Sequence, residues 1–269
     1  MASATEWESI LRAAAAVDDD ALDVAQVALA LAAADHPSED LESHRDHLDR
    51  LAEPLGGVQP DAAALSARIA GRFGYRGDSE TYDDTRNADL IEVIRRRRGL
   101  PVALGILYMH AARAQGWTIA GLNFPGHFLL RLGTGEETAI IDPFFAGRVL
   151  TVGQVGEMLA GMAGPKVQLQ PAHMATVPAR HVLMRLLNNI KLRALQSGNR
   201  ARADEILRRT SLFAPGEAAP WLERAELAAH EGNLIRAREL IAFGIGAVAP
   251  GPMRDWLVEA QARYGRQLN

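Results

Sequence analysis

The segment from Pro101 to Gln115 most constrains the fold, because a helix formed there carries apolar side chains on almost every face. Six apolar residues are spread around it: Val102, Leu104, Ile106, Leu107, Met109 and Ala111. A helix without a polar face is normally buried inside a domain. The sequence therefore predicts one buried central helix with other elements packed around it.

The start of this helix is marked by Pro101, which suits a first helical position because no backbone N–H donor is needed there. Before it, the segment Asp89 to Arg98 predicts a short helix that ends in four successive arginines. Cations are favourable at the C-terminal end of a helix dipole, so a solvated helix end explains these arginines. Binding of a ligand's negative charge is the alternative interpretation.

Two strand-like runs follow the central helix, at Thr118–Leu132 and Thr138–Asp142. The residues between them, Gly133–Glu137, contain two glycines and are typical of a hairpin turn. Pro143 ends the second run. A small antiparallel sheet is therefore expected beside the central helix.

His127 and Asp142 are equidistant from the Thr134–Gly135 pair in the middle of this turn. If the turn is centred there, the two side chains face each other across the strands, with Cβ atoms about 4.5–5.5 Å apart. A centre one half-position later would make them diagonal neighbours. A carboxylate can fix the tautomer of an imidazole and raise its basicity, as in the base half of a catalytic triad. A buried structural hydrogen bond is the alternative explanation.

Five short segments carry a resemblance to a known family. They are Phe73-Gly74-Tyr75-Arg76-Gly77, Tyr82 with Asn87, Arg97 to Val102, Phe124 to Phe128, and Ile141 to Phe144. Together they resemble the core of the SirB-type transglutaminase-like family. The likeness is clearest over residues 74–150, and weaker similarity in the flanking helices extends it to nearly the whole chain.

The resemblance implies an α+β, papain-like core. Active transglutaminase-like enzymes begin the central helix with a cysteine, and a histidine and an aspartate follow on adjacent strands; His127 and Asp142 match these two. The chain contains no cysteine. Relatives of the SirB type often carry Ser or Thr where this chain has Ala103. Thiol chemistry is therefore excluded, and the resemblance implies a pseudoenzyme or a site that works without a protein nucleophile.

The resemblance also implies a pocket at the start of the central helix. The free backbone N–H groups after Pro101 would favour an anion or a carbonyl oxygen. Tyr82 and Asn87 are expected to lie near this pocket, and Arg98 is expected to contact a bound ligand. A helix cap ahead of Asp89 is the alternative role of Asn87.

The flanking regions are predicted to be helical. Asp18–Asp20 are expected to cap a helix that runs from about Ala21 to Ala34. In the second half, Gly198-Asn199 recurs as Gly232-Asn233, an offset of 34 residues that matches the tetratricopeptide period.

We predict three regions. Residues 1–72 form N-terminal helices packed on the core, residues 73–165 form the transglutaminase-like core with a small antiparallel sheet, and residues 180–269 form tetratricopeptide-like helical hairpins.

Composition and motifs limit the partners, cofactors and cellular location that we expect for this chain. The net charge is −4, which disfavours general binding of nucleic acid or of an anionic membrane. No glycine-rich phosphate loop and no His-x-x-x-His or Glu-x-x-His spacing of a helical metal site occurs, so neither a cofactor nor a metal is predicted. The N-terminus lacks the basic residues of a signal peptide, and no apolar run spans a bilayer, so we expect a cytoplasmic protein.

Three functions remain open from the sequence. The first is a non-catalytic module that binds a protein or peptide through the core cleft and the C-terminal helices. The second is a hydrolase of an amide or ester bond, in which His127 oriented by Asp142 activates water. The third is a scaffold that acts through the tail alone.

Overall fold

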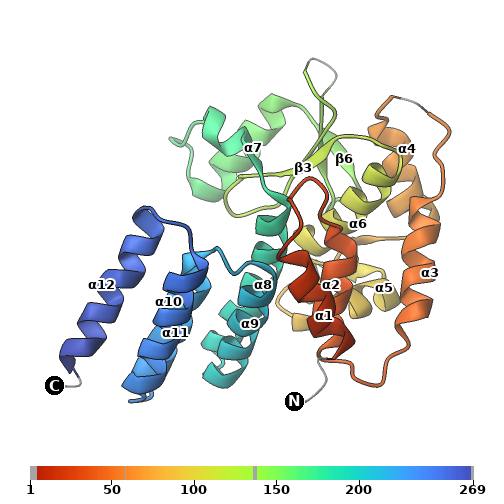
Figure 1. Ribbon diagram of the computed structural model, residues 1–269. Helices are drawn as coiled ribbons and strands as arrows, with labels where there is room; N and C mark the ends of the chain where they lie inside the picture. Colours follow the sequence, from red (N-terminus) through yellow and green to blue (C-terminus); the bar gives the residue numbers. More distant parts are fainter. Residues whose placement is uncertain (1–4, 58, 136–137, 268–269) are drawn as a thin grey trace. The chain divides into compact units, whose positions relative to one another are not determined.

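The computed structural model describes residues 5–57, 59–135 and 138–267 of the 269-residue chain (Figure 1). The chain divides into two compact units, and the division falls within helix α8 (Ala179–Gln196). Residues 18–186 form the core unit, and residues 1–17 with 187–269 form the tail unit. Each unit is described separately below. The three predicted regions have other boundaries, and that partition stays a prediction.

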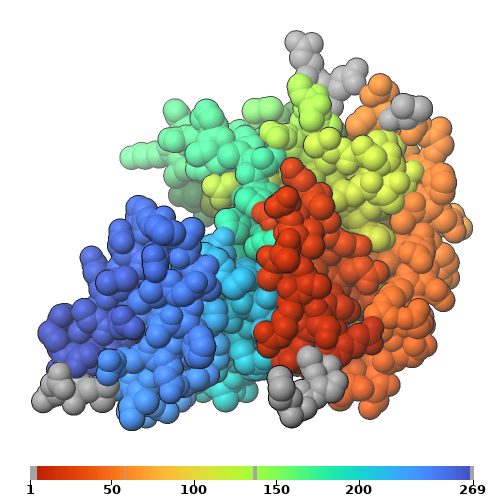
Figure 2. Space-filling view, viewed as in Figure 1, coloured from red at the N-terminus to blue at the C-terminus, as the bar shows by residue number. Residues whose placement is uncertain are grey.

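The core unit combines helices with a small sheet, as the predicted α+β class requires. Its helical elements before the sheet are α2 (Val24–Ala33), α3 (Leu41–Ala52), α4 (Ala62–Ser66), η1 (Ala67–Arg72), η2 (Thr85–Ala88), α5 (Leu90–Arg96) and α6 (Pro101–Ala114). After the sheet come α7 (Val152–Ala163) and η3 (Pro171–Met174). Figure 2 shows α3, in orange, at the surface of this unit.

The buried central helix is α6, and its predicted start at Pro101 is confirmed. Every residue from Pro101 to Met109 is buried, because α2, α3, α4 and α5 all pack against this helix. Burial of such an apolar helix contributes hydrophobic stabilisation to the core unit.

The main sheet has five antiparallel strands in the order β6-β5-β4-β3-β7. The strands are β3 (Ile119–Leu122), β4 (Leu130–Leu132), β5 (Ala139–Asp142), β6 (Arg148–Leu150) and β7 (Thr176–Val177). A separate parallel pair joins β1 (Arg76–Gly77) to β2 (Arg98–Gly99). Residues 136 and 137 of the predicted hairpin turn lie outside the described residues.

The run predicted as one strand from Thr118 to Leu132 is instead two antiparallel strands, β3 and β4. The reason lies in the residues between them. Pro125 has no N–H for a ladder hydrogen bond, and Gly126 has a φ of 73°, a left-handed conformation that reverses the chain. The backbone N–H of Leu122 donates to the carbonyl of Leu129 at 2.9 Å and closes this turn.

The cap of the first core helix was also predicted at the wrong residue. Asp23, rather than Asp18–Asp20, accepts hydrogen bonds from the backbone N–H groups of Ala25 and Gln26. The acidic cluster lies one turn earlier in the chain, so α2 begins at Val24 instead of Ala21.

The tail unit consists of helices. They are α1 (Glu6–Ala14), the end of α8, α9 (Arg200–Phe213), α10 (Ala218–His230), α11 (Leu234–Ala247) and α12 (Pro252–Gln267). The repeated Gly-Asn pairs have a structural basis, because Asn199 and Asn233 cap α9 and α11 with equivalent hydrogen bonds of 3.0 Å. Gly198 and Gly232 both have positive φ values, 74° and 80°. The tetratricopeptide assignment itself stays a prediction.

Candidate functional site

The predicted pair of His127 and Asp142 is brought together in the core unit. Nε2 of His127 lies 3.0 Å from each carboxylate oxygen of Asp142. The Asp142 side chain is only 1% exposed, and the His127 side chain is 13% exposed. The carboxylate therefore fixes which ring nitrogen carries the proton, since Nε2 must donate to it.

The route by which the pair meets differs from the prediction. Leu130 pairs with Ile141 in the β4–β5 ladder, which centres the turn one residue later than expected and excludes direct opposition of His127 and Asp142. His127 precedes β4 and lies in the turn that follows Gly126. The contact is therefore made by a side chain from a turn reaching the last residue of β5.

Asp142 also organises the chain that follows it. Its Oδ1 accepts hydrogen bonds from the backbone N–H groups of Phe144, at 3.0 Å, and Phe145, at 3.4 Å. These bonds place both aromatic rings beside His127, with centroids 6.1 Å and 6.4 Å from the imidazole centroid. A single buried carboxylate thus positions the imidazole and the two rings that flank it.

At the start of α6, where the resemblance implies a nucleophile, the residues are buried and apolar. Leu100, Val102 and Ala103 are at most 2% exposed, and none carries a nucleophilic atom. Further along α6, the ring of Phe128 lies so close to Gly105 that a Cβ there would be 2.4 Å from a ring carbon. Close packing therefore continues from the helix start to the turn that carries His127.

Arg185 of α8 supports this turn and was missed by the sequence reasoning. Its guanidinium donates to the carbonyl oxygens of Phe124, at 3.2 Å, and His127, at 2.5 Å. It also lies over the ring of Phe128, 5.4 Å from the centroid. Because Arg185 is 58 residues from His127 in the chain, no local motif indicated this contact.

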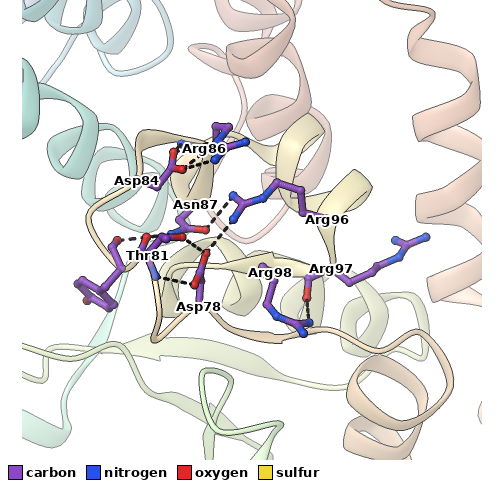
Figure 3. Close-up of polar contacts among 9 residues, drawn as sticks. Asp78, Thr81, Asp84, Arg86, Asn87, Arg96, Arg97 and Arg98 are labelled. Atoms are coloured by element: carbon purple, nitrogen blue, oxygen red, sulfur yellow. Dashed lines mark hydrogen bonds and ion pairs between the residues drawn. The ribbon is translucent and has the colours of Figure 1, made fainter.

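Asn87 is fully buried, and both ends of its amide bind protein groups (Figure 3). Its Nδ2 donates to the carbonyl of Thr81 at 2.6 Å, and its Oδ1 accepts from Arg96 at 3.0 Å. The alternative role as a helix cap is wrong, because Asp89 itself caps α5. The predicted contact of Asn87 with a ligand stays a prediction, although its hydrogen bonds serve the loop.

The same loop is held by Asp78, which is 6% exposed. Its carboxylate accepts from Thr81 Oγ1 at 2.6 Å and from Arg96 Nη2 at 2.7 Å. The hydrogen bond from Thr81 is the largest cause that lowers the pKa of Asp78 to about 2. This network anchors the loop that presents Tyr82, whose ring is 41% exposed and packs edge-on against Phe144.

The four successive arginines have different surroundings and do not form a uniform solvated end. Arg95 pairs with Glu39 and Glu92, and Arg96 pairs with Asp78. Arg98 lies in β2 and its guanidinium donates to the carbonyl of Arg97 at 3.2 Å. Figure 3 shows the Arg97 side chain directed away from the Asp78 network. Pro101 is buried at the first position of α6, and the predicted ligand contacts of Arg98 and Pro101 stay predictions.

Metal and membrane features were also sought in the described parts of the chain. Within residues 5–57, 59–135 and 138–267, no three His, Asp or Glu side chains are grouped so that they could hold a metal ion. Among the same residues, every helix is too short or too polar to cross a bilayer.

Comparison with known proteins agrees with this architecture. A family profile described as the transglutaminase-like superfamily matches residues 29–188. That match spans more than half of the chain, and the chain therefore belongs to the transglutaminase-like superfamily.

The relatives narrow the assignment. A UPF0162 protein of Xylella fastidiosa is 31% identical over 199 residues, which cover 68% of this chain and 68% of the relative. A UPF0162 protein of Vibrio cholerae is 32% identical over 182 residues, covering 65% and 67% of the two chains. Within the superfamily, the chain is a member of the UPF0162 family, and the SirB-type resemblance is consistent with that label.

Two more distant similarities were found. Human F-box only protein 21 is 32% identical over 150 residues, which are 53% of this chain but only 22% of that protein. A crystal structure of menin aligns with a TM-score of 0.44 and 10% identity, covering 94% of this chain and 73% of the menin chain.

Proposed function

We propose that this protein is a non-catalytic transglutaminase-like module that binds a protein or peptide. One observation carries the proposal. The position implied for the nucleophile is filled by apolar, buried residues, and Ala103 there is 0% exposed. The chain also has no cysteine that could replace it from elsewhere. Acyl transfer through a protein thiol is therefore impossible, whereas the surrounding fold is intact.

The surface beside the His127–Asp142 pair suits a peptide. Phe145 is 59% exposed and Tyr82 is 41% exposed, and both belong to the aromatic group around His127. Exposed aromatic side chains of this kind commonly supply most of the binding energy of a protein interface. The Nδ1 edge of His127 makes no hydrogen bond to any described residue and can bond a peptide carbonyl or N–H, according to its protonation.

The tail unit supplies a second candidate surface for a protein partner. A groove of about 610 Å³ lies within this unit, between helices α1, α9, α10 and α11. Phe243 at this groove is 63% exposed, and Trp221 and Leu240 line its apolar part. Stacked helix pairs present concave surfaces of this sort to protein ligands.

Peptide binding can be tested directly with the full-length chain. An array of unmodified peptides of mixed sequence is probed with the wild-type protein and with Phe145→Ala. We expect selected peptides to bind the wild-type protein and to bind Phe145→Ala at least about fivefold more weakly, because truncating an interface aromatic commonly costs more than about 1 kcal/mol.

Ile235→Ala is the matched control. Ile235 is 67% exposed and lies on α11 in the tail unit. Its substitution therefore removes exposed apolar surface and leaves the aromatic group around His127 unchanged. Equal loss of binding in both variants would contradict a site beside His127, and an array without selective binding would contradict the proposal.

A hydrolase acting through water is the second candidate. The observation that favours it is the orientation of His127, whose Nε2 is held by a buried carboxylate while the Nδ1 edge remains available to accept a proton from water. The test is hydrolysis of p-nitrophenyl acetate and of an amide analogue, compared between wild type, His127→Gln and Asp142→Asn. If the wild type hydrolyses either substrate and both variants lose that activity, the hydrolase function would be favoured over the binding proposal. We expect no hydrolysis that depends on His127.

A further inference from the structure

A second cluster in the core unit surrounds His47 of α3, which is 3% exposed. Nε2 of His47 lies 2.7 Å from the hydroxyl of Tyr75 and 2.6 Å from Nη1 of Arg97. On the opposite edge of the ring, Nδ1 lies 3.3 Å from Nη2 of Arg50. Two guanidinium groups therefore approach one imidazole from its two nitrogen edges.

The hydrogen-bond donors in this cluster exceed the acceptors. A neutral imidazole has one donor and one acceptor, and a guanidinium only donates. If the Tyr75 hydroxyl donates to Nε2 and accepts from Arg97, then the Nδ1–H of His47 faces an N–H of Arg50. In the reverse tautomer Nδ1 accepts from Arg50, and Nε2–H and Arg97 both donate to the Tyr75 hydroxyl oxygen, so that the Tyr75 O–H has no acceptor within the cluster. In either tautomer one donor of the cluster therefore lacks an acceptor among these four side chains, and an anion bound at this surface would supply one.

The positive charge of the cluster is also uncompensated. Within the described part of the chain, neither Arg50 nor Arg97 forms an ion pair with a carboxylate. The nearby Arg72, by contrast, pairs with Glu53. Two guanidiniums separated by one imidazole repel each other, and an anion in contact with both would offset that repulsion.

Arg97 reaches this place through an uncommon backbone conformation. Its φ is 56° and ψ is 28°, the left-handed region, which costs a residue with a Cβ about 1–2 kcal/mol. The conformation turns its side chain away from Asp78 and Arg96, as Figure 3 shows, and over the ring of Tyr75, 4.8 Å from the centroid. Strained residues of this kind concentrate at ligand-binding positions.

We propose that Arg50 and Arg97, together with the His47–Tyr75 pair between them, form a binding site for a phosphoryl oxyanion, either free phosphate or the phosphate group of a small molecule. A guanidinium presents paired N–H groups that match two oxygens of such an anion. The site uses none of the residues around His127, so it goes beyond the proposed peptide binding and does not depend on it.

The electrostatics of His47 agree with this arrangement. Burial, followed by the charges of Arg97 and Arg50, lowers the pKa of His47 to about 4. The imidazole is neutral near pH 7, so that it offers a single N–H and adds no third positive charge to the cluster. Anion selectivity then depends on the two arginines.

Isothermal titration calorimetry of the full-length chain with inorganic phosphate, at pH 7.5 and constant ionic strength, tests the site. We expect saturable binding to one site, weakened about tenfold or more in Arg50→Gln, which removes an exposed side chain and one guanidinium contact. A parallel titration with glycerol 3-phosphate identifies the source: tighter binding than inorganic phosphate assigns the site to a phosphorylated small molecule, and weaker binding assigns it to free phosphate.

Arg76→Gln is the matched control, because Arg76 is an exposed arginine next to Tyr75 in the chain, with no side-chain hydrogen bond or ion pair among the described residues. It should bind phosphate like the wild type. Absence of saturable binding, or an equal loss in Arg76→Gln and Arg50→Gln, would overturn the proposal. NMR gives an independent test, because bound phosphate should shift the imidazole ¹⁵N resonances of His47. Resonances that stay unchanged at saturating phosphate would also contradict the site.

Discussion

Asp142 holds His127 through Nε2, at 3.0 Å from both carboxylate oxygens, and at the same time accepts the backbone N–H of Phe144. The imidazole and the aromatic group beside it are therefore positioned by one buried carboxylate. In a chain without a thiol, this relationship fixes the shape of the site.

Asp142→Asn should destabilise the core unit by about 1–3 kcal/mol, because the amide cannot accept all the hydrogen bonds that the carboxylate receives and one of its own donors would be buried unpaired. Chemical unfolding of the two proteins measures the difference. Asp49→Asn, at an exposed position of α3, is the control and should change stability by less than about 0.5 kcal/mol. Similar values for both would show that Asp142 is not a structural centre.

Gly105→Ala should destabilise the protein by about 1–3 kcal/mol or more, since the new Cβ would lie 2.4 Å from the ring of Phe128. Gly161 lies in α7, and no atom lies within 4 Å of the position that a Cβ would occupy there. Gly161→Ala should therefore be neutral or stabilising by up to about 1 kcal/mol. Thermal unfolding of the pair distinguishes the packing effect from helix propensity. A stable Gly105→Ala would mean that Phe128 can move off α6.

Ala103→Cys gives a chain with a single thiol at the helix start. Because Ala103 is 0% exposed, we expect Ellman's reagent to react with the native protein at least about a hundredfold more slowly than with the urea-unfolded protein, since reaction requires opening of the core. Rapid reaction in the native state would show that the helix start is accessible and would favour the hydrolase.

His47 should make stability depend on pH in a defined window. Its folded pKa of about 4 lies below the ordinary value of 6.5, so the unfolded chain binds the additional proton between these values. The contribution to stability is therefore present above about pH 6.5 and falls as the pH decreases to about 4, by at most about 1.4 kcal/mol per pH unit. Unfolding of wild type and His47→Gln from pH 7.5 to 4 should show a weaker pH dependence in the variant; parallel curves would contradict the lowered pKa.

Asp78 should act at lower pH. Its folded pKa of about 2 lies below the usual value of 3.8, so its stabilising contribution is present above about pH 4 and is lost as the pH falls toward 2. The stability difference between wild type and Asp78→Asn should accordingly shrink over this range. A difference that is constant with pH would indicate that the carboxylate is not held by Thr81 and Arg96 in its charged form.

Several features of this protein follow from local sequence. The unbroken apolar surface of residues 101–115 required a buried helix, since no polar face was available for water, and Pro101 fixed its start. The α+β class was implied by the family resemblance, and the contact between His127 and Asp142 could be anticipated because the two residues are equidistant from the predicted turn.

The errors at the site have a common physical cause. The turn after Gly126 and the register of β4 against β5 depend on which backbone groups find partners across strands, and the spacing of two residues in the sequence does not determine this. The ligand contact of Asn87 stays a prediction, and the partners that its amide has in the structure, Thr81 and Arg96, likewise depend on how the loop packs.

The sequence by itself determined that this chain has no thiol and that one helix must lie in its interior, because composition and hydrophobic periodicity are local properties. Only the tertiary structure decided that Arg185 holds the His127 turn and that Arg97 lies opposite Arg50 at His47. Those contacts join residues about 50 positions or more apart, and the free energy that selects such partners arises from packing the whole unit.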